Sequence, residues 1–560
     1  MGDLRLRGMS AIGTTDDFNN YSTVIFGTNV LVTSRGDINS LVDYKNIDVV
    51  NTEQARFCGL FLNCNVLTTA PKLSATTLDY FCYKEMFKGC TNLVDAPKLP
   101  ATTLADYCYW SMFDGCTNLV NAPELPATAL DDCCYFYMFN GCTSLVNAPK
   151  LPATTLAKSC YSSMFGYCTS LVNAPQLPAS TLKDNCYASM FYGCTSLVNA
   201  PKSLGTTLAD YCCWLMFRDC TSLVNAPQLP ATALKTNCYT FMFAGCTSLV
   251  DAPELIADNL ANNCYKGMFE GCTSLIKAPE LPAKKLVNEC YFGMFENCTN
   301  LEEAPQLPAL VLADKCYAGM FNKCTSLTST PQLPATTLAK SCYNGMFSGC
   351  TNLTIVSKLI ATTLADYCYA GMFDSCINLI KAPDLPATTL KEFCYGYMFY
   401  GCTNLKEAPQ LPALDLALGC YNDMFNGCSS LTTPPDLPAL QLADRCYASM
   451  FNGCTSLTTA PILPAPQLTS SCYAGMFYGC TNLNNVTFLA TELGDDNNWG
   501  FWMRGVSSTG TFIKAKEMET SILQEAGVIP NGWTIKDQEK EDSSANGNME
   551  NPNESNSSEW

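Results

Sequence analysis

Cysteine recurs in this chain at a fixed interval of 26 residues, and this period constrains the fold more than any other feature. One set of 16 cysteines runs in steps of 26 from Cys82 to Cys472, and a second set of 17 runs from Cys64 to Cys480. A period of roughly 20 to 50 residues indicates one supersecondary unit stacked many times. We therefore expect a solenoid, although a chain of 560 residues would otherwise suggest several domains.

Other residue types also recur in columns, once in each rung of the expected solenoid. Phenylalanine fills one column from Phe61 to Phe477, and methionine fills the preceding column from Met86 to Met476. In residues 160–185 the apolar side chains fall 0, 1, 4, 5 and 8 positions after the first cysteine, which matches one face of a helix. The sequence thus predicts a short helix of about ten residues in each rung. The buried core columns are predicted to be those that contain Cys160, Met164, Phe165, Cys168 and Leu171.

The predicted helix has signals at both ends. Thr103 and Asp106 have the spacing of a capping box, with Asp in place of Glu. A glycine such as Gly89 precedes the second cysteine in most rungs, which is typical of a left-handed C-cap. Asparagine takes this place at Asn63 and Asn297 and suits the same cap. Four other rungs break the column, and we expect that their caps differ; the replacements are Tyr167, Asp219, Lys323 and Ser375.

The other half of each rung, as in residues 145–152, is predicted to be extended. Proline recurs there from Pro71 to Pro461, with Ser357 in place of one proline. Because proline cannot donate a ladder hydrogen bond, a fully paired central strand is excluded. We expect a short strand at Leu-Val-Asn followed by a polyproline-like segment, with rungs about 4.8 Å apart. A single rung cannot bury enough apolar surface to fold alone, so neighbours must cover both of its faces and the ends need caps.

Charge and composition exclude some classes of function. The net charge is −18 and the pI is about 4.5, which argues against nucleic-acid binding because that requires basic patches. No run of eighteen apolar residues predicts a transmembrane helix. The first fifteen residues lack the apolar core of a signal peptide. We expect that an export signal has been removed or never recorded, or that the protein is not exported by the ordinary route.

The cysteines allow two interpretations. Disulfides would place the protein in an oxidising compartment, whereas a column of small buried thiols would not. Cys160 and Cys168 would lie about 12 Å apart along a helix, too far for a bridge within the rung. Adjacent helices at about 8–10 Å would also prevent bridges between rungs, so buried thiols are favoured.

No catalytic or cofactor-binding constellation is found in the sequence. The chain has no histidine, which removes Ser-His and Cys-His pairs and the commonest zinc ligand. Two cysteines separated by seven residues do not have zinc-knuckle spacing, and the glycines form no phosphate-binding cluster. The adjacent pairs at Cys133 and Cys213 fit variable positions, with a vicinal disulfide as the alternative. We predict no enzyme activity, no metal and no cofactor.

The candidate binding surface consists of side chains that should escape the core. They are the two residues after the strand leucine and the residue after the first proline. The second residue after leucine and the residue after proline form a candidate binding strip: Asp95, Asn121, Asn147, Asn173, Asn199, Asn225 and Asp251, with Lys98, Glu124, Lys150, Gln176 and Lys202. Two interpretations remain open for the asparagine run, namely an amide ladder that stabilises the stack and a polar binding strip.

A second variable position follows the Cys-Tyr pair and often carries aromatic residues. They are Trp110, Phe136, Tyr137, Trp214, Phe241, Phe292 and Tyr397. These side chains either anchor a ligand or pack against neighbouring rungs.

The repeat MFxGCTSLxxAPxLPATTLAxxCY, as in residues 138–161, resembles the BspA-like leucine-rich repeat proteins of Bacteroides-type bacteria. It is also similar to the MFxxC-type repeats of mycoplasma surface proteins. The resemblance covers roughly residues 57–490, and both flanks resemble the caps of that group. It implies a surface-exposed or secreted adhesion protein that binds host proteins, glycans or neighbouring cells. It supplies no catalytic residues.

Together these features predict an α/β solenoid, a leucine-rich-repeat-like right-handed superhelix of about 16–17 rungs with a strand-like segment and a short helix in each. The predicted domains are a β-rich N-terminal cap at 1–56, the solenoid at 57–490, a C-terminal cap module at 491–535 and a disordered acidic tail at 536–560. The predicted function is non-enzymatic adhesion through the repeated face, acting by many weak contacts. The alternative is a phage virion or tail-associated protein that binds the host.

Overall fold

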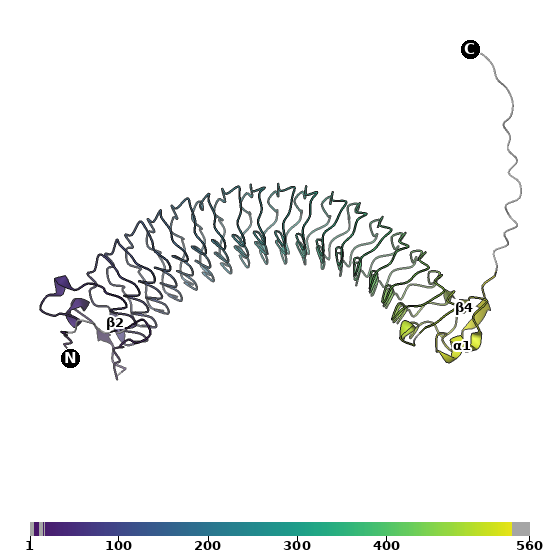
Figure 1. Ribbon diagram of the computed structural model, residues 1–560, viewed down its shortest axis with the longest axis horizontal. Coiled ribbons are helices and arrows are strands. Elements are labelled where there is room, and N and C mark those ends of the chain that lie inside the picture. The colour runs from purple at the N-terminus through teal and green to yellow at the C-terminus, as the bar shows by residue number, and fades with distance from the viewer. Residues whose placement is uncertain (1–4, 10–14, 16, 28, 495, 540–560) are drawn as a thin grey trace, which may run out of the picture.

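The rungs stack into one long arc. A computed structural model describes residues 5–9, 15, 17–27, 29–494 and 496–539. Figure 1 shows the rungs side by side along the arc, from β2 near the N-terminal end to β4 and α1 at the C-terminal end. A solenoid of repeated rungs, as the 26-residue period predicts, is therefore confirmed.

Regular secondary structure lies only at the two ends of the arc. In residues 70–484, all of which the structure describes, there is no helix and no strand of more than one residue. The N-terminal elements are β1 (Val32–Thr33), the 3-10 helices η1 (Ile38–Leu41) and η2 (Ile47–Val49), and β2 (Leu67–Thr69). The C-terminal elements are β3 (Asn485–Phe488), the 3-10 helix η3 (Asp496–Trp499), β4 (Thr511–Lys514), α1 (Thr520–Glu525) and β5 (Thr534–Asp537).

The helix predicted in each rung is wrong, because a series of tight turns replaces it. In residues 159–168, which we call the turn segment, the N–H groups of residues 162, 164, 166 and 168 each donate to a carbonyl three residues back, as Met164 does to Tyr161 at 3.2 Å. The intervening N–H groups donate to the next rung, as Phe165 does to Met190 at 2.9 Å. Both halves of the backbone are thus bonded, and an α-helical ladder has no donors left to form it.

Each turn ends at a residue in the left-handed region, and these residues recur every fourth position. In one rung they are Ser159, Ser163 and Tyr167, with φ of 53°, 54° and 57°. A residue with this φ cannot lie within an α-helix, so three of them exclude a helix of this length. Offsets of 0, 1, 4, 5 and 8 fit a four-residue turn period as well as a helical period of 3.6, which explains the error in the sequence-based prediction.

The proposed helix ends also have other roles. Asp106 does not cap a helix; its carboxylate accepts a hydrogen bond at 2.9 Å from the N–H of Asp132, its equivalent in the next rung. The glycine before the second cysteine does have the expected left-handed φ, as Gly89 shows with 72°. The expectation that non-glycine replacements change this conformation is wrong, since Tyr167 and Lys323 have φ of 57° and 59°.

The extended half of each rung contacts its neighbour through isolated parallel bridges rather than through a continuous strand. Asn121, Asn147 and Asn173 pair in this way along the stack. The short strand predicted at Leu-Val-Asn is therefore reduced to one bridging residue in most rungs. The prolines beyond it limit further pairing, as their missing N–H predicts.

The core is a set of side-chain columns that runs the length of the arc. Phenylalanine rings in successive rungs stack with centroids 5.4–5.9 Å apart. The tyrosines after the first cysteine form a parallel stack that is interrupted where Cys213 replaces a tyrosine. The predicted core columns are fully buried at the five positions chosen to represent them, which are Cys160, Met164, Phe165, Cys168 and Leu171. Neighbouring rungs thus supply the burial that one rung cannot provide.

The two ends of the stack are closed by different elements. At the N-terminus, β1 pairs in parallel with β2. At the C-terminus, β3, β4 and β5 form a parallel sheet, and the Trp502 indole donates to the carbonyl of Val528 at 2.9 Å. Strand β5 continues to Asp537, two residues beyond the cap boundary predicted at 535. Residues 540–560 of the predicted tail lie outside the described residues.

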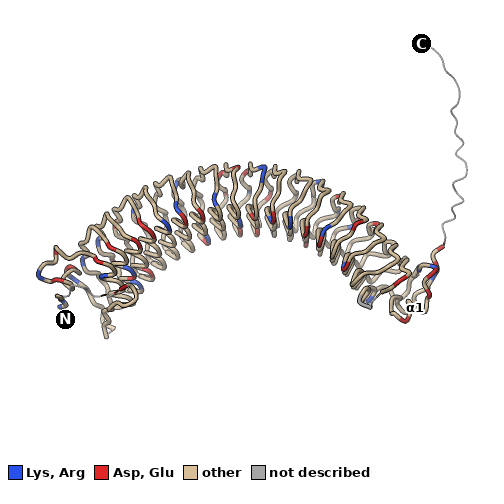
Figure 2. Tube along the Cα trace, in the orientation of Figure 1, with Lys and Arg blue, Asp and Glu red and all other residues tan. Residues whose placement is uncertain are grey.

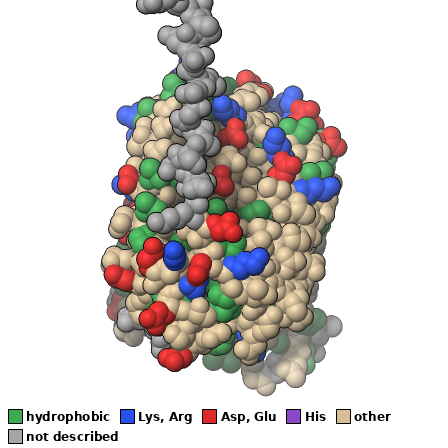
Figure 3. Space-filling view, turned by 90° about the vertical axis from the view of Figure 1, so that its right-hand side faces the viewer, with side chains coloured by type: hydrophobic (Ala, Val, Ile, Leu, Met, Phe, Trp, Pro, Cys, Tyr) green, Lys and Arg blue, Asp and Glu red, His purple; other side chains and the backbone are tan. Residues whose placement is uncertain are grey.

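Seen from its C-terminal end, the arc presents a mixed surface. Figure 3 shows apolar, acidic and basic side chains interspersed there, without a broad apolar expanse on the visible face. A polar outer face of this kind is what a terminal cap needs for solubility.

Candidate binding surface

The thiols of the second cysteine set are hydrogen-bond donors in the core. Cys168 donates from Sγ to the carbonyl of Phe139 at 3.1 Å, and the same bond recurs in each rung from Cys90 to Cys480. Burial raises the pKa of thiols in both sets, to about 12 for Cys108 and Cys194, so they are protonated at neutral pH. The structure therefore uses these thiols as buried donors, as the buried-thiol interpretation predicts.

The distance argument against disulfides between rungs is nevertheless wrong. It assumed adjacent helices at about 8–10 Å. Backbone hydrogen bonds instead join the rungs directly, as between Phe165 and Met190. Chains bonded in this way lie about 4.8 Å apart, a spacing that does not exclude a bridge between equivalent cysteines. For the second cysteine set, thiol donation to a backbone carbonyl, rather than distance, favours the reduced state. Among the described residues, no three cysteine, aspartate or glutamate side chains gather as a metal-binding group.

All twelve residues of the candidate binding strip are exposed. At one part of the strip the amides also bond to one another: Asn199 donates to Asn173 at 2.8 Å, and Asn225 donates to Asn199 at 2.9 Å. The amide ladder is therefore present at these three rungs. Because the same residues remain exposed, the ladder leaves their outer surface accessible.

The residue between the strand leucine and the strip forms an exposed aliphatic column. We call residues Val94, Val120, Val146, Val172, Val198, Val224, Val250 and Ile276 the valine column. Seven of the eight side chains, all except Val198, are 37–49% exposed. Backbone bonds such as that from Val224 to the carbonyl of Val198, at 3.1 Å, hold the column together. The sequence predicts that this position escapes the core, and the signal that could have identified it as a candidate surface is its aliphatic residue in eight successive rungs.

Most of the variable aromatic residues pack against their own stack. Trp110 lies edge-on to Phe136 at 5.9 Å, and Lys84 lies 4.8 Å from its ring. Phe292 is likewise covered by Lys266 at 4.7 Å. Packing between rungs therefore accounts for these aromatics. Tyr397 differs, because it lines an open groove near the C-terminal end.

That groove, which we call the C-terminal groove, has a volume of about 520 Å³. Its lining includes Tyr397, Asp423, Arg445, Tyr478 and Arg504. Burial raises the pKa of the Asp423 carboxyl, which accepts a hydrogen bond from Asn426 at 2.7 Å. Only Tyr397 among these residues was identified from the sequence.

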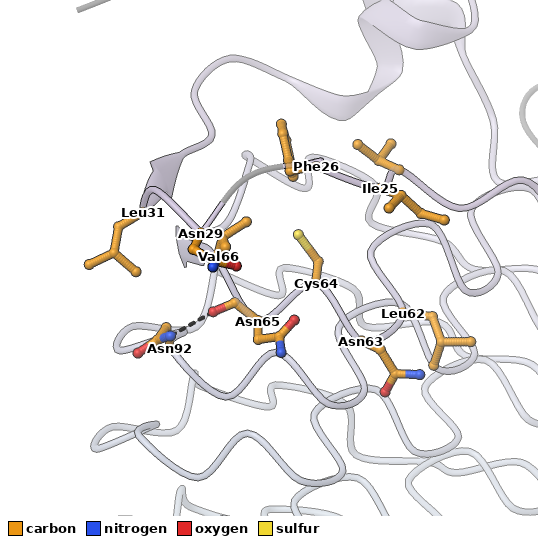
Figure 4. A pocket seen from close by; sticks show the side chains of 11 residues that line it. Ile25, Phe26, Asn29, Leu31, Leu62, Asn63, Cys64, Asn65, Val66 and Asn92 are labelled. Atoms are coloured by element: carbon orange, nitrogen blue, oxygen red, sulfur yellow. Dashed lines mark hydrogen bonds between the residues drawn. The ribbon is translucent and has the colours of Figure 1, made fainter.

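A smaller crevice of about 310 Å³ lies at the N-terminal end, between residues 24–26, 29 and 31 and the first rung. Figure 4 shows its side chains, among which Asn92 donates to the carbonyl of Asn65 at 2.6 Å. Ile25 and Leu31 beside it are strongly exposed. The crevice holds no charged side chain, so its lining indicates no particular ligand chemistry.

Charge is distributed along the whole arc. Figure 2 shows acidic and basic side chains interspersed from one end to the other, with no basic stripe. Within the described residues, no helix is long and apolar enough to span a membrane.

Comparison with known proteins places the repeat in a family. A family model described as "BspA type Leucine rich repeat region (6 copies)" matches residues 59–198, 206–329, 314–433 and 420–496. No curated protein and no solved structure matches the chain. Because the family model covers well over half of the sequence, the chain belongs to the BspA-type leucine-rich repeat proteins.

Proposed function

We propose that this protein is a surface-exposed or secreted adhesin that binds a protein or glycan of a host or neighbouring cell. Proteins of this family are typically surface binding proteins and are generally not enzymes. The observation that carries the proposal is the valine column beside the candidate binding strip. Monomeric proteins rarely expose a contiguous apolar surface of this length unless it is an interaction site.

The arrangement of the two columns suits recognition of an extended partner. The valine column would supply the apolar contact area, and the exposed polar side chains of Asp95, Asn121 and Asn147 would supply hydrogen bonds beside it. The backbone of the column is already bonded from rung to rung, so little order has to be gained on binding. Repetition over eight rungs would let individually weak contacts act together.

The test is a triple substitution of Val120, Val146 and Val172 with lysine. The full-length variant and the wild type would be compared on an array of extracellular-matrix proteins, mucins and glycans. We expect at least a tenfold loss of binding to whichever probe the wild type binds, because three central contacts are replaced by charges. A second variant, with Asn147, Asn173 and Asn199 replaced by lysine, tests the strip separately.

A matched control is available on another exposed column. Leu310, Leu414 and Leu440 are exposed aliphatic side chains at one repeat position outside the valine column, and their replacement with lysine adds the same charge. This control should bind as the wild type does. Wild-type binding by a correctly folded valine variant would contradict the role of the valine column.

A further inference from the structure

The C-terminal groove is formed by the order of residues in a single repeat column. Tyr397, Asp423, Ser449, Gly475 and Phe501 follow one another at 26-residue intervals and all line the groove. The small side chain of Ser449 and the absence of a side chain at Gly475 leave a hollow between the aromatic residues at the two ends. Four rung steps at about 4.8 Å give the groove a length of about 20 Å.

The aromatic rings around the hollow are accessible to a ligand. Tyr397 and Tyr478 are 43% and 42% exposed, and Phe501 is 71% exposed. They do not belong to the buried ring stacks of the core. Rings of this kind offer flat apolar faces, with a polar edge on each tyrosine, that a ligand can cover.

The groove also gathers positive charge in an acidic protein. The whole chain has seven arginines and a net charge of −18, yet Arg445 and Arg504 both line this groove. Neither guanidinium forms an ion pair within the described residues. Arg504 lies 5.6 Å from the centre of the Phe501 ring, a cation–π contact that leaves its N–H groups without a carboxylate partner. Asp423, the acidic residue in the lining, is already bound by the amides of Asn422 and Asn426. The two guanidinium groups are therefore available to a carboxylate, which they bind in a planar, two-bonded geometry.

The backbone of the groove does not favour a peptide. Asp423, Ser449 and Gly475 donate their N–H groups to the next rung, at 2.9, 2.8 and 2.9 Å. An extended peptide would therefore find no free donors with which to pair as an added strand. The remaining polar groups are side-chain amides and hydroxyls, such as those of Asn452 and Ser449, which suit the hydroxyl groups of a sugar.

We propose that the C-terminal groove binds an oligosaccharide that carries a carboxylate. The arginines pair with the carboxylate, the exposed rings cover the apolar faces of the sugar units, and the amides and hydroxyls bond to the sugar hydroxyls. The inference rests on the proposed adhesive function and assigns one ligand class to a second surface, separate from the valine column.

Calorimetry with the full chain tests this directly. The probes are trigalacturonate and 3′-sialyllactose as carboxylate sugars, lactose as a neutral sugar and hexaglutamate as an acidic peptide. We expect at least one carboxylate sugar to bind, at least tenfold more tightly than lactose or hexaglutamate, and the first two probes distinguish a uronic acid from a sialic acid. Equal binding of lactose, or binding of hexaglutamate alone, would overturn the proposal.

Three variants locate the binding. Arg445→Gln with Arg504→Gln should weaken binding of the carboxylate sugar at least tenfold. Ser449→Tyr should fill the hollow without unfolding the rung, because Tyr137 occupies the same column with φ of 55°. Arg218→Gln is the matched control, since Arg218 lies in the same repeat column as Arg504 but outside the groove. Unchanged binding by the double arginine variant would refute the site.

The outcome also separates this inference from the proposed function. If the chain binds array probes through the valine column but no carboxylate sugar, only the inference about the groove fails. If it binds neither, both fail.

Discussion

Replacing Gly319 with alanine discriminates between turns and a helix by the sign of its effect on stability. Gly319 lies in the middle of the segment that the sequence predicts to be helical, and in the structure its φ is +62°. A Cβ at this position would contact nothing within 4 Å. The substitution therefore adds no clash, and its effect depends on backbone conformation alone.

The two conformations predict opposite results. In a helix interior, alanine would stabilise the protein by about 1 kcal/mol relative to glycine. In the left-handed region, alanine costs about 1–2 kcal/mol, partly offset by the lower entropy of the unfolded chain, which favours alanine by about 0.4–1 kcal/mol. We expect a net destabilisation of about 0.5–1 kcal/mol for each site. Gly371 lies two rungs away, its φ is +60°, and an added Cβ would meet only the Asp374 Cβ, at 4.0 Å, which is an ordinary contact. Effects at sites this far apart add, so the double variant of Gly319 and Gly371 should lose about 1–2 kcal/mol.

Denaturant unfolding, monitored by circular dichroism, measures the difference. Gly396→Ala is the matched control, because Gly396 lies one position before this column and lacks a positive φ, and Ala318 and Ala370 occupy its own column in other rungs. This control should be neutral or slightly stabilising. Stabilisation by Gly319→Ala would refute the assignment of turns.

Further predictions concern the core and its thiols. The buried thiols should make the protein labile to alkali. Thiols in the unfolded chain ionise near pH 8.5, whereas Cys108 and Cys194 in the folded chain keep their protons until about pH 12. The free energy of unfolding should therefore be full below pH 8.5 and fall as the pH rises toward 12, by about 1.4 kcal/mol for each such thiol and pH unit. A pH series of circular dichroism spectra checks this, and a flat response up to pH 11 would contradict it. Phe321→Ala should lower the free energy of unfolding by about 3–5 kcal/mol, because Phe321 is fully buried between Phe295 and Phe347. Thermal unfolding measures the loss, and the control variant Phe321→Leu should lose less. In a thiol titration without reductant, the denatured protein should show all 36 thiols and the native protein very few; a lower total after denaturation would indicate disulfides.

The stacked columns could be predicted from sequence because burial selects the same residue type in every rung. Phe165 and Cys168 recur at fixed positions, and both are fully buried. The period and the identity of the columns together determine what each rung shares with its neighbours, even without knowledge of the local backbone.

The local backbone was predicted wrongly because side-chain spacing alone does not distinguish a four-residue turn from a helical turn. A second signal was present. Gly267, Gly293 and Gly319 fill a column four positions before the glycine column that was interpreted as a C-cap. Two glycine-rich columns four residues apart are unfavourable for a helix but fit turns with left-handed ends. Hydrogen bonds to the next rung make these turns possible, and they depend on neighbours that are distant in sequence.

The candidate surface was predictable only in part. The exposure of Asn147 follows from its place between two core columns, whereas the C-terminal groove depends on which side chains succeed one another in an outward-facing column. Once the column of Ser449 and Gly475 is known to face outward, the hollow between Tyr397 and Phe501 can be read from the sequence.

The rungs form one continuous stack, and small-angle X-ray scattering of residues 1–539 measures whether they do so in solution. With rungs about 4.8 Å apart, sixteen of them predict a maximum dimension of more than about 75 Å and the profile of an elongated particle. A compact domain of this length would have a radius of gyration of about 24 Å and a diameter of about 60 Å. An elongated profile is the expected result, and a compact particle would contradict the stacked arrangement.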